Sequence, residues 1–119
     1  MTKPPRPAAA TAALDDAAFP AYTMSAAAGI IGVTPAFLRA AEAAGLFEAA
    51  RSEGGHRRYS RDDLVRANRA RQLVDDGIRL DAAARIVSLE YQLAAAHAMI
   101  DLLRRKSDRQ NLVAKSDVP

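Results

Sequence analysis

The stretch GVTPAFLRAAEAAGLF, residues 32 to 47, carries signals for both the start and the end of a helix. Thr34 supplies a hydroxyl that can accept hydrogen bonds from the first backbone amides of a helix. Pro35 lacks the N–H group that would be unpaired at the first helical position, and Gly45 tolerates the left-handed conformation at which helices often stop. The sequence therefore predicts a short helix over residues 35–44.

The residues before this helix predict another one. Ser25 can cap a helix over AAAGII, residues 26 to 31, and Gly32 would end it. Two short helices joined around Gly32 and Val33 have the helix-turn-helix layout, although any helical hairpin would share this pattern. Four apolar residues are expected to pack the two helices together: Ile30, Val33, Phe37 and Leu38. Four others are left for the outer face: Thr34, Ala36, Arg39 and Ala40.

A basic turn follows at residues 51 to 60, with the sequence RSEGGHRRYS. Gly54 and Gly55 can supply the positive φ angles that a tight hairpin needs, so we predict a two-stranded ribbon over residues 51–59. An isolated ribbon is only marginally stable in water. We therefore expect it to pack against the helices through Leu46 and Tyr59.

The net charge of +3 is unevenly distributed along the chain. Between Arg51 and Arg71 there are seven arginines and three acidic residues, so this window carries +4 and the remaining residues sum to −1. The planar guanidinium fork of arginine suits phosphate groups, so a local excess of arginine favours a polyanionic partner. A solvated surface is the alternative interpretation of the same composition.

The second half of the chain predicts further helices. Ser60 and Asp63 have the spacing of a capping box, and a helical repeat of apolar residues follows until Asp75, Asp76 and Gly77 close the helix. A fourth helix is expected to begin near Asp81. Five residues then alternate in steps of four and three, which is the spacing of a coiled-coil seam: Leu89, Leu93, Ala96, Ile100 and Leu103.

Several functional classes are not expected. The chain has no cysteine, and His56 and His97 lie 41 positions apart without further ligands at metal spacing, so neither a metal site nor a cofactor is predicted. Its adjacent aspartate pairs suit helix ends, and no serine has a histidine and acid partner in view, so we predict no catalytic residues and no enzyme. No signal peptide and no membrane-spanning run are recognised, which predicts a soluble cytoplasmic protein.

The order of these parts resembles a known family. The segments at residues 22–47, 51–64 and 75–87, YTMSAAAGIIGVTPAFLRAAEAAGLF, RSEGGHRRYSRDDL and DDGIRLDAAARIV, are similar to the DNA-binding region of MerR-family bacterial transcription regulators. The resemblance implies a mostly α fold, a winged helix-turn-helix with a two-stranded wing followed by a coiled-coil-like helix. We expect a flexible tail at 1–21, the DNA-binding domain at 22–88, a dimerisation helix at 89–106 and a second flexible tail at 107–119.

The resemblance also implies roles for individual residues. Thr34, Ala36 and Phe37 would open the recognition helix in the major groove of double-stranded DNA, and Arg39 matches the family's DNA-contacting arginine. His56 and Arg57 match the aromatic and the arginine of the wing, and Tyr59, which also suits the core, matches its closing tyrosine. Because Arg57 and Arg58 alternate along a strand, we expect one to face DNA and the other to face solvent or an acid, with Arg57 as the favoured contact.

The resemblance further implies a homodimer through the seam of the last helix, with RNA polymerase as a further partner. Ala40 and Ala41 stand where the family commonly has two aromatic residues, which weakens the expectation of strong DNA distortion. No effector pocket is expected, because neither a ligand-binding domain nor metal-binding cysteines follow the seam.

The sequence therefore predicts a non-enzymatic, sequence-specific DNA-binding transcription regulator on the bacterial nucleoid, using the helix at 35–44 and the wing at 51–59. Substitution of Arg39 is expected to relax specificity, and substitution of Arg57 to lower affinity for all DNA alike. Two alternatives remain. One is an architectural, excisionase-like protein that binds direct repeats cooperatively, and the other is a protein-interaction module with weak DNA affinity.

Overall fold

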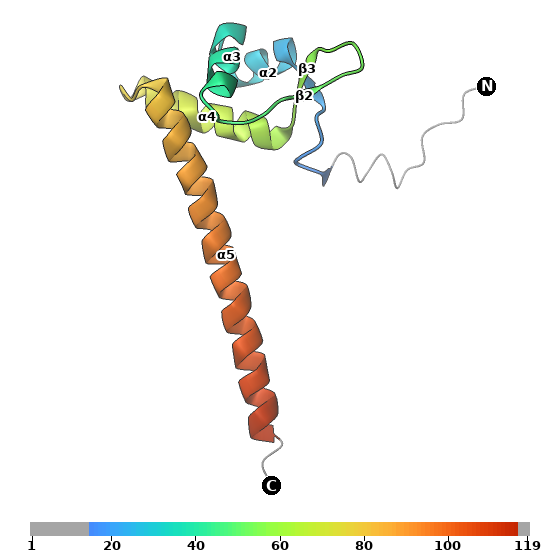
Figure 1. Ribbon diagram of the computed structural model, residues 1–119, viewed down its shortest axis with the longest axis vertical. Coiled ribbons are helices and arrows are strands. Elements are labelled where there is room, and N and C mark those ends of the chain that lie inside the picture. Colours follow the sequence, from blue (N-terminus) through green and yellow to red (C-terminus); the bar gives the residue numbers. More distant parts are fainter. Residues whose placement is uncertain (1–14, 117–119) are drawn as a thin grey trace, which may run out of the picture. The chain divides into compact units, whose positions relative to one another are not determined.

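The computed structural model describes residues 15–116 of the chain (Figure 1). Its elements are, in order, β1 (Tyr22–Thr23), α2 (Met24–Ile31), α3 (Pro35–Ala43), β2 (Ala50–Arg51), β3 (Arg57–Tyr59), α4 (Arg61–Asp75) and α5 (Leu80–Ser116). This mostly helical architecture with a small antiparallel sheet confirms the predicted winged helix-turn-helix fold class. The chain divides into two compact units, the first ending at Val87 and the second beginning at Ser88.

Helix α2 begins earlier than expected. Thr23, not Ser25, is its N-cap, and the Thr23 hydroxyl accepts a hydrogen bond from the Ala26 amide at 3.1 Å. The prediction of Ser25 was wrong because Thr23, at the end of β1, already has the extended backbone that an N-cap requires. The helix ends as predicted at Gly32, whose φ of 77° lies in the left-handed region.

Helix α3 confirms its predicted start and end. The Thr34 hydroxyl accepts from the Phe37 amide at 3.1 Å, Pro35 takes the first helical position, and Gly45 has a φ of 85°. The expected outer face is exposed, and it comprises Thr34, Ala36, Arg39 and Ala40. The expected packing role of Ile30 is wrong, since its exposed fraction is 63%. The inner face of α2 is centred on Ala27 and Ala28, and 3.6 residues per turn place Ile30 to one side of it.

The sheet has three strands, not two. β3 lies in the middle, with β1 and β2 antiparallel on either side of it. Tyr22 is opposite Tyr59 in the first pair, and Arg51 is opposite Arg57 in the second. A strand of two residues is too short to show an alternation of apolar and polar side chains, so β1 could not be predicted from the sequence.

The core of the first unit forms around α2, which contacts α3, α4, β1 and β3. Fully buried alanines on four helices, including Ala27, Ala41 and Ala67, let the backbones approach closely. The larger buried residues are Leu38, Leu46, Phe47, Tyr59, Leu64, Leu73 and Val87. The ribbon packs against the helices as expected, because β3 contacts α2, and both Leu46 and Tyr59 are buried.

The segment before β1 and the start of α4 are joined by hydrogen bonds. The Asp62 amide donates to the Ala17 carbonyl at 3.0 Å, and the Arg61 guanidinium donates to the Asp15 carbonyl at 3.2 Å. Residues 15–21, expected to belong to a tail, are thus tied to α4, while residues 1–14 lie outside the described residues. The capping box of α4 is confirmed, because the Ser60 hydroxyl accepts from the Asp63 amide and the Asp63 carboxylate from the Ser60 amide, each at 3.0 Å.

Helix α5 unites the two last helices that the sequence predicted. Its first residues belong to the first unit, where Ala83, Ala84 and Val87 are buried. It continues to Ser116, so the expectation that the helix ends near residue 106 was wrong. Residues 106–116 contain neither glycine nor proline, and nothing in them stops the helix. Residues 117–119 of the expected tail lie outside the described residues.

The second unit is a length of α5 with many exposed apolar side chains. The predicted seam residues Leu89, Leu93, Ile100 and Leu103 have exposed fractions of 51%, 57%, 43% and 56%. By length and composition alone, α5 could cross a membrane within Leu80–Ala114, where an 18-residue window has a mean hydropathy of 1.2, although no membrane-spanning run was expected. One such helix is weak evidence for a membrane segment, because an unpartnered apolar seam also raises the mean hydropathy.

Candidate nucleic-acid interface

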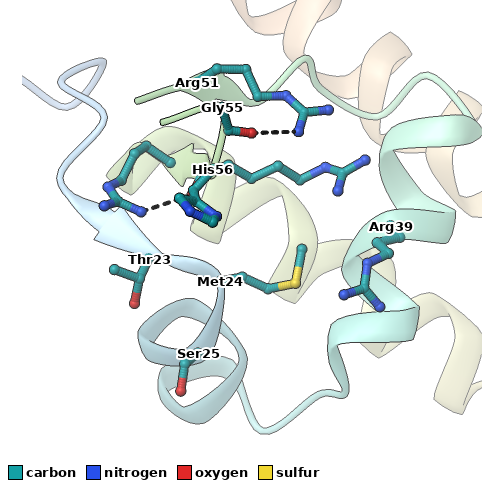
Figure 2. A pocket seen from close by; sticks show the side chains of 9 residues that line it. Thr23, Met24, Ser25, Arg39, Arg51, Gly55 and His56 are labelled. Carbon is teal, nitrogen blue, oxygen red and sulfur yellow. Dashed lines mark hydrogen bonds between the residues drawn. The ribbon is translucent and has the colours of Figure 1, made fainter. Parts of the chain in front are cut away.

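A hollow of about 330 Å³ opens on the first unit between the ribbon, α3 and the junction of β1 with α2 (Figure 2). Nine residues line it: Thr23, Met24, Ser25, Arg39, Arg51, Gly55, His56, Arg57 and Arg58. Figure 2 shows the Met24 side chain extending into the hollow and Arg39 projecting from α3 at its side. Thus four arginines and one histidine, contributed by separate elements, meet around one space.

The turn of the ribbon fixes the first of these cations. The Arg51 guanidinium donates to the Gly55 carbonyl at 3.2 Å, a contact that Figure 2 marks with a dashed line. The Ser52 amide donates to the His56 carbonyl at 2.8 Å, and Gly55 takes the positive φ of 79° that the turn requires. Because a carbonyl is neutral, Arg51 keeps its full positive charge toward the hollow.

The two arginines of β3 have different partners. Arg57 Nε donates to Glu42 Oε2 at 2.7 Å, and the exposed fractions of the two side chains are 27% and 19%. Arg58 Nη1 donates to the Arg57 carbonyl at 3.3 Å. The sequence predicted that one of these arginines faces DNA and the other faces solvent or an acid, and it favoured Arg57 as the DNA contact. In the structure it is Arg57 that pairs with an acid, Glu42.

Tyr59 lies in the core and does not line the hollow. Its side chain is fully buried, and its ring meets that of Phe47 edge-on, with 5.7 Å between ring centroids and 85° between planes. Burial raises the pKa of the Tyr59 hydroxyl above 10.0, while the nearby positive charge of Arg57 lowers it by a smaller amount. Tyr59 therefore remains neutral at physiological pH and supports β3 from the inside.

Residues 22–90 match the family described as MerR HTH family regulatory protein. The chain belongs to the MerR family. This match covers more than half of the sequence and confirms the resemblance drawn from the ordered motifs. A putative heat shock protein HspR from Streptomyces coelicolor is 39% identical over 80 residues, which are 66% of this chain and 53% of that protein. The MerR-family chain thus spans about half the length of the curated relative it matches.

In this MerR-family fold, the predicted site residues divide into two groups. Arg39, His56, Arg57 and Arg58 line the hollow together. Thr34 and Ala36 are exposed, and Phe37 is half-buried, at the start of the helix that carries Arg39. These three precede Arg39 at the N-terminal end of α3 and do not line the hollow, and neither does the buried Tyr59.

The predicted site lacked five residues of the hollow, Thr23, Met24, Ser25, Arg51 and Gly55, of which Gly55 was predicted only as part of the turn. Arg51 could have been found, because Arg51 and Arg57 lie symmetrically about Gly54 and a tight hairpin pairs such positions. Thr23, Met24 and Ser25 lie in β1 or directly after it, and this strand could not be predicted from the sequence. In the described part of the chain, no group of three or more histidine or acidic side chains is placed to hold a metal ion.

Proposed function

We propose that this MerR-family protein is a sequence-specific DNA-binding transcription regulator. It contacts DNA through α3 and through the wing, defined here as β2, β3 and the turn between them. The observation that carries this proposal is the hollow itself, where Arg39 of α3 meets Arg51, Arg57 and Arg58 of the wing. Guanidinium forks bind phosphate oxygens through charge-assisted hydrogen bonds, and their convergence suits a polyanion.

The exposed face of α3 suits base recognition in the major groove, which is wide enough to admit a helix. Arg39 is the one long polar side chain between Thr34 and Glu42, so direct base readout depends mainly on it. Ala36 and Ala40 can add apolar contacts with thymine methyl groups. Those wing arginines that contact phosphate hold the protein in register on the backbone, because phosphate contacts position a protein without reading sequence.

The exposed seam of α5 supports a homodimer. Leu89, Leu93, Ile100 and Leu103 present apolar surface at coiled-coil spacing, and a second copy of the helix would bury it. A two-fold dimer places two copies of α3 on inverted half-sites. In this proposal the protein acts in the bacterial cytoplasm at promoters, with RNA polymerase as its downstream partner and no enzymatic activity of its own.

Selection from random duplex DNA, followed by footprinting of the recovered sites, tests this function. We expect the full chain to recover a defined sequence as paired inverted half-sites. Tandem direct repeats would instead support the architectural, excisionase-like alternative, and failure to enrich any sequence would contradict the proposed specificity. The Arg85→Ala variant serves as a control that should recover the same sites as the wild type, because Arg85 is exposed on α5 and does not line the hollow.

A further inference from the structure

The ion pair between Arg57 and Glu42 joins the wing to the recognition helix. Glu42 lies on α3, one turn after Arg39, and Arg57 lies on β3, fifteen residues further along the chain than Glu42. By contrast, Arg71 and Asp75 pair at 2.8 Å within a single helix, where the pair cannot fix one element against another. The Arg57–Glu42 pair therefore sets how the wing stands beside α3.

The surroundings of this pair favour its persistence. Less than a third of either side chain is exposed, so the attraction is screened less than in a pair at the open surface. If Arg57 turned away to a phosphate, the Glu42 carboxylate would be left partly buried without its counter-ion. A polyanion nearby would add like-charge repulsion, so bound DNA strengthens the need for Arg57 at Glu42.

We propose that Glu42 is a positioning residue that neutralises Arg57 and leaves Arg51 and Arg58 as the phosphate contacts of the wing. This inference rests on the proposed function, and it changes the role that the sequence analysis gave to Arg57. Arg51 and Arg58 donate to neutral carbonyl oxygens, so both keep the net charge that a phosphate requires. Arg57 acts through Glu42 by holding the wing and α3 in register. Its loss should therefore reduce sequence specificity more than affinity for DNA in general.

Salt dependence separates direct phosphate contact from positioning. The logarithm of the binding constant falls with the logarithm of salt concentration by about 0.9 for each phosphate that a cation neutralises. We expect Arg58→Gln to reduce this slope by about 0.9 on every duplex. Arg57→Gln should leave the slope unchanged while weakening binding to the selected site more than to a scrambled duplex of equal length.

The Glu42→Gln variant should change the salt-dependence slope in the opposite direction from Arg58→Gln. It releases Arg57 as a further cation for phosphate, so the slope should steepen by about 0.9 and binding to the scrambled duplex should tighten. The double variant Glu42→Gln/Arg57→Gln, whose two amides can hydrogen-bond to each other, should return both the slope and the preference for the selected site toward wild type. A loss of folding alone would not produce these opposed changes.

The experiment is fluorescence anisotropy with the full chain, on the selected and scrambled duplexes, over a series of salt concentrations. The inference is overturned if Arg57→Gln lowers the slope as Arg58→Gln does, or if Glu42→Gln changes neither slope nor preference. Because Glu42→Gln is nearly isosteric, it decides the question even if Arg57→Gln does not fold. If the wild type binds neither duplex, the proposed function itself fails. If the wild type binds and Arg57→Gln has a smaller salt-dependence slope, only the inference about Glu42 fails.

Discussion

Tyr59 is the residue at which the core meets the arginines of the wing. It pairs with Tyr22 of β1 across the sheet, contacts Phe47, and follows directly after Arg57 and Arg58. Because its hydroxyl is buried, only the neutral form fits its site. Because Tyr59 is buried, the packing of the first unit also determines where β3 places Arg57 and Arg58.

The raised pKa of Tyr59 predicts a loss of stability in alkali. The folded state holds the phenol proton more tightly than the unfolded state, whose value is near 10.0. The contribution of Tyr59 is thus fully present below pH 10 and is lost as pH rises above it, because the unfolded state releases the proton first. Urea unfolding between pH 8 and pH 11.5 should show that the free energy of unfolding falls more steeply with pH in the wild type than in Tyr59→Phe. Equal pH profiles would contradict this assignment.

In the proposed function, Arg39 is the residue on which base recognition depends most. We expect Arg39→Ala to lower affinity for the selected site by about 1–3 kcal/mol and to lower affinity for scrambled DNA by less, because a base contact adds energy only at the right base. Competition binding with the two duplexes measures the difference. Arg58→Ala serves as the comparison, since a phosphate contact should weaken both duplexes alike. An equal loss on both duplexes for Arg39→Ala would assign Arg39 to the backbone.

At the scale of the element, the start of α4 is fixed by its capping box. Ser60 and Asp63 satisfy each other's backbone amides, and Ser60 is 6% exposed. Removal of the hydroxyl by Ser60→Ala should lower the free energy of unfolding by about 0.5–2 kcal/mol. Chemical denaturation measures this, with Ser107→Ala on the exposed face of α5 as a control that we expect to change stability by less than about 0.5 kcal/mol. If Ser60→Ala and Ser107→Ala changed the free energy of unfolding equally, the capping box would contribute no more than an ordinary surface serine.

The elements also show what a sequence can predict. The caps at Thr34 and Ser60 were predictable, because each depends on residues within three positions of itself. The strand β1 and the Arg57–Glu42 pair were not, since both join residues distant in sequence. Burial of Ala27 in place of Ile30 depends on how α2 is rotated against its neighbours, which apolar content alone does not fix. Motif order predicted Arg39, Arg57 and Arg58 as site residues, whereas the place of Arg51 and the partner of Arg57 are evident only from the structure.

At the scale of the whole molecule, the proposed dimer depends on the face of α5 that carries the seam. Ile100 and Leu102 are both exposed, at 43% and 58%, but only Ile100 has a seam position. Ile100→Glu places a charge in the helix interface and should yield monomers. Leu102→Glu makes the same chemical change on another face and should leave the dimer intact. Sedimentation at micromolar concentration distinguishes these outcomes, and a monomeric wild type would contradict the dimer.

In the proposed function, arginines from α3, β2 and β3 of the first unit form one DNA-binding surface. The most direct measurement is a titration of labelled duplex at low salt with the triple variant Arg39→Ala/Arg51→Ala/Arg58→Ala. The control is Arg79→Ala/Arg85→Ala/Arg105→Ala, which removes the same charge from exposed residues that do not line the hollow. We predict that the first variant loses binding to every duplex while the control binds nearly as wild type does. Equal binding by the two variants would contradict the account.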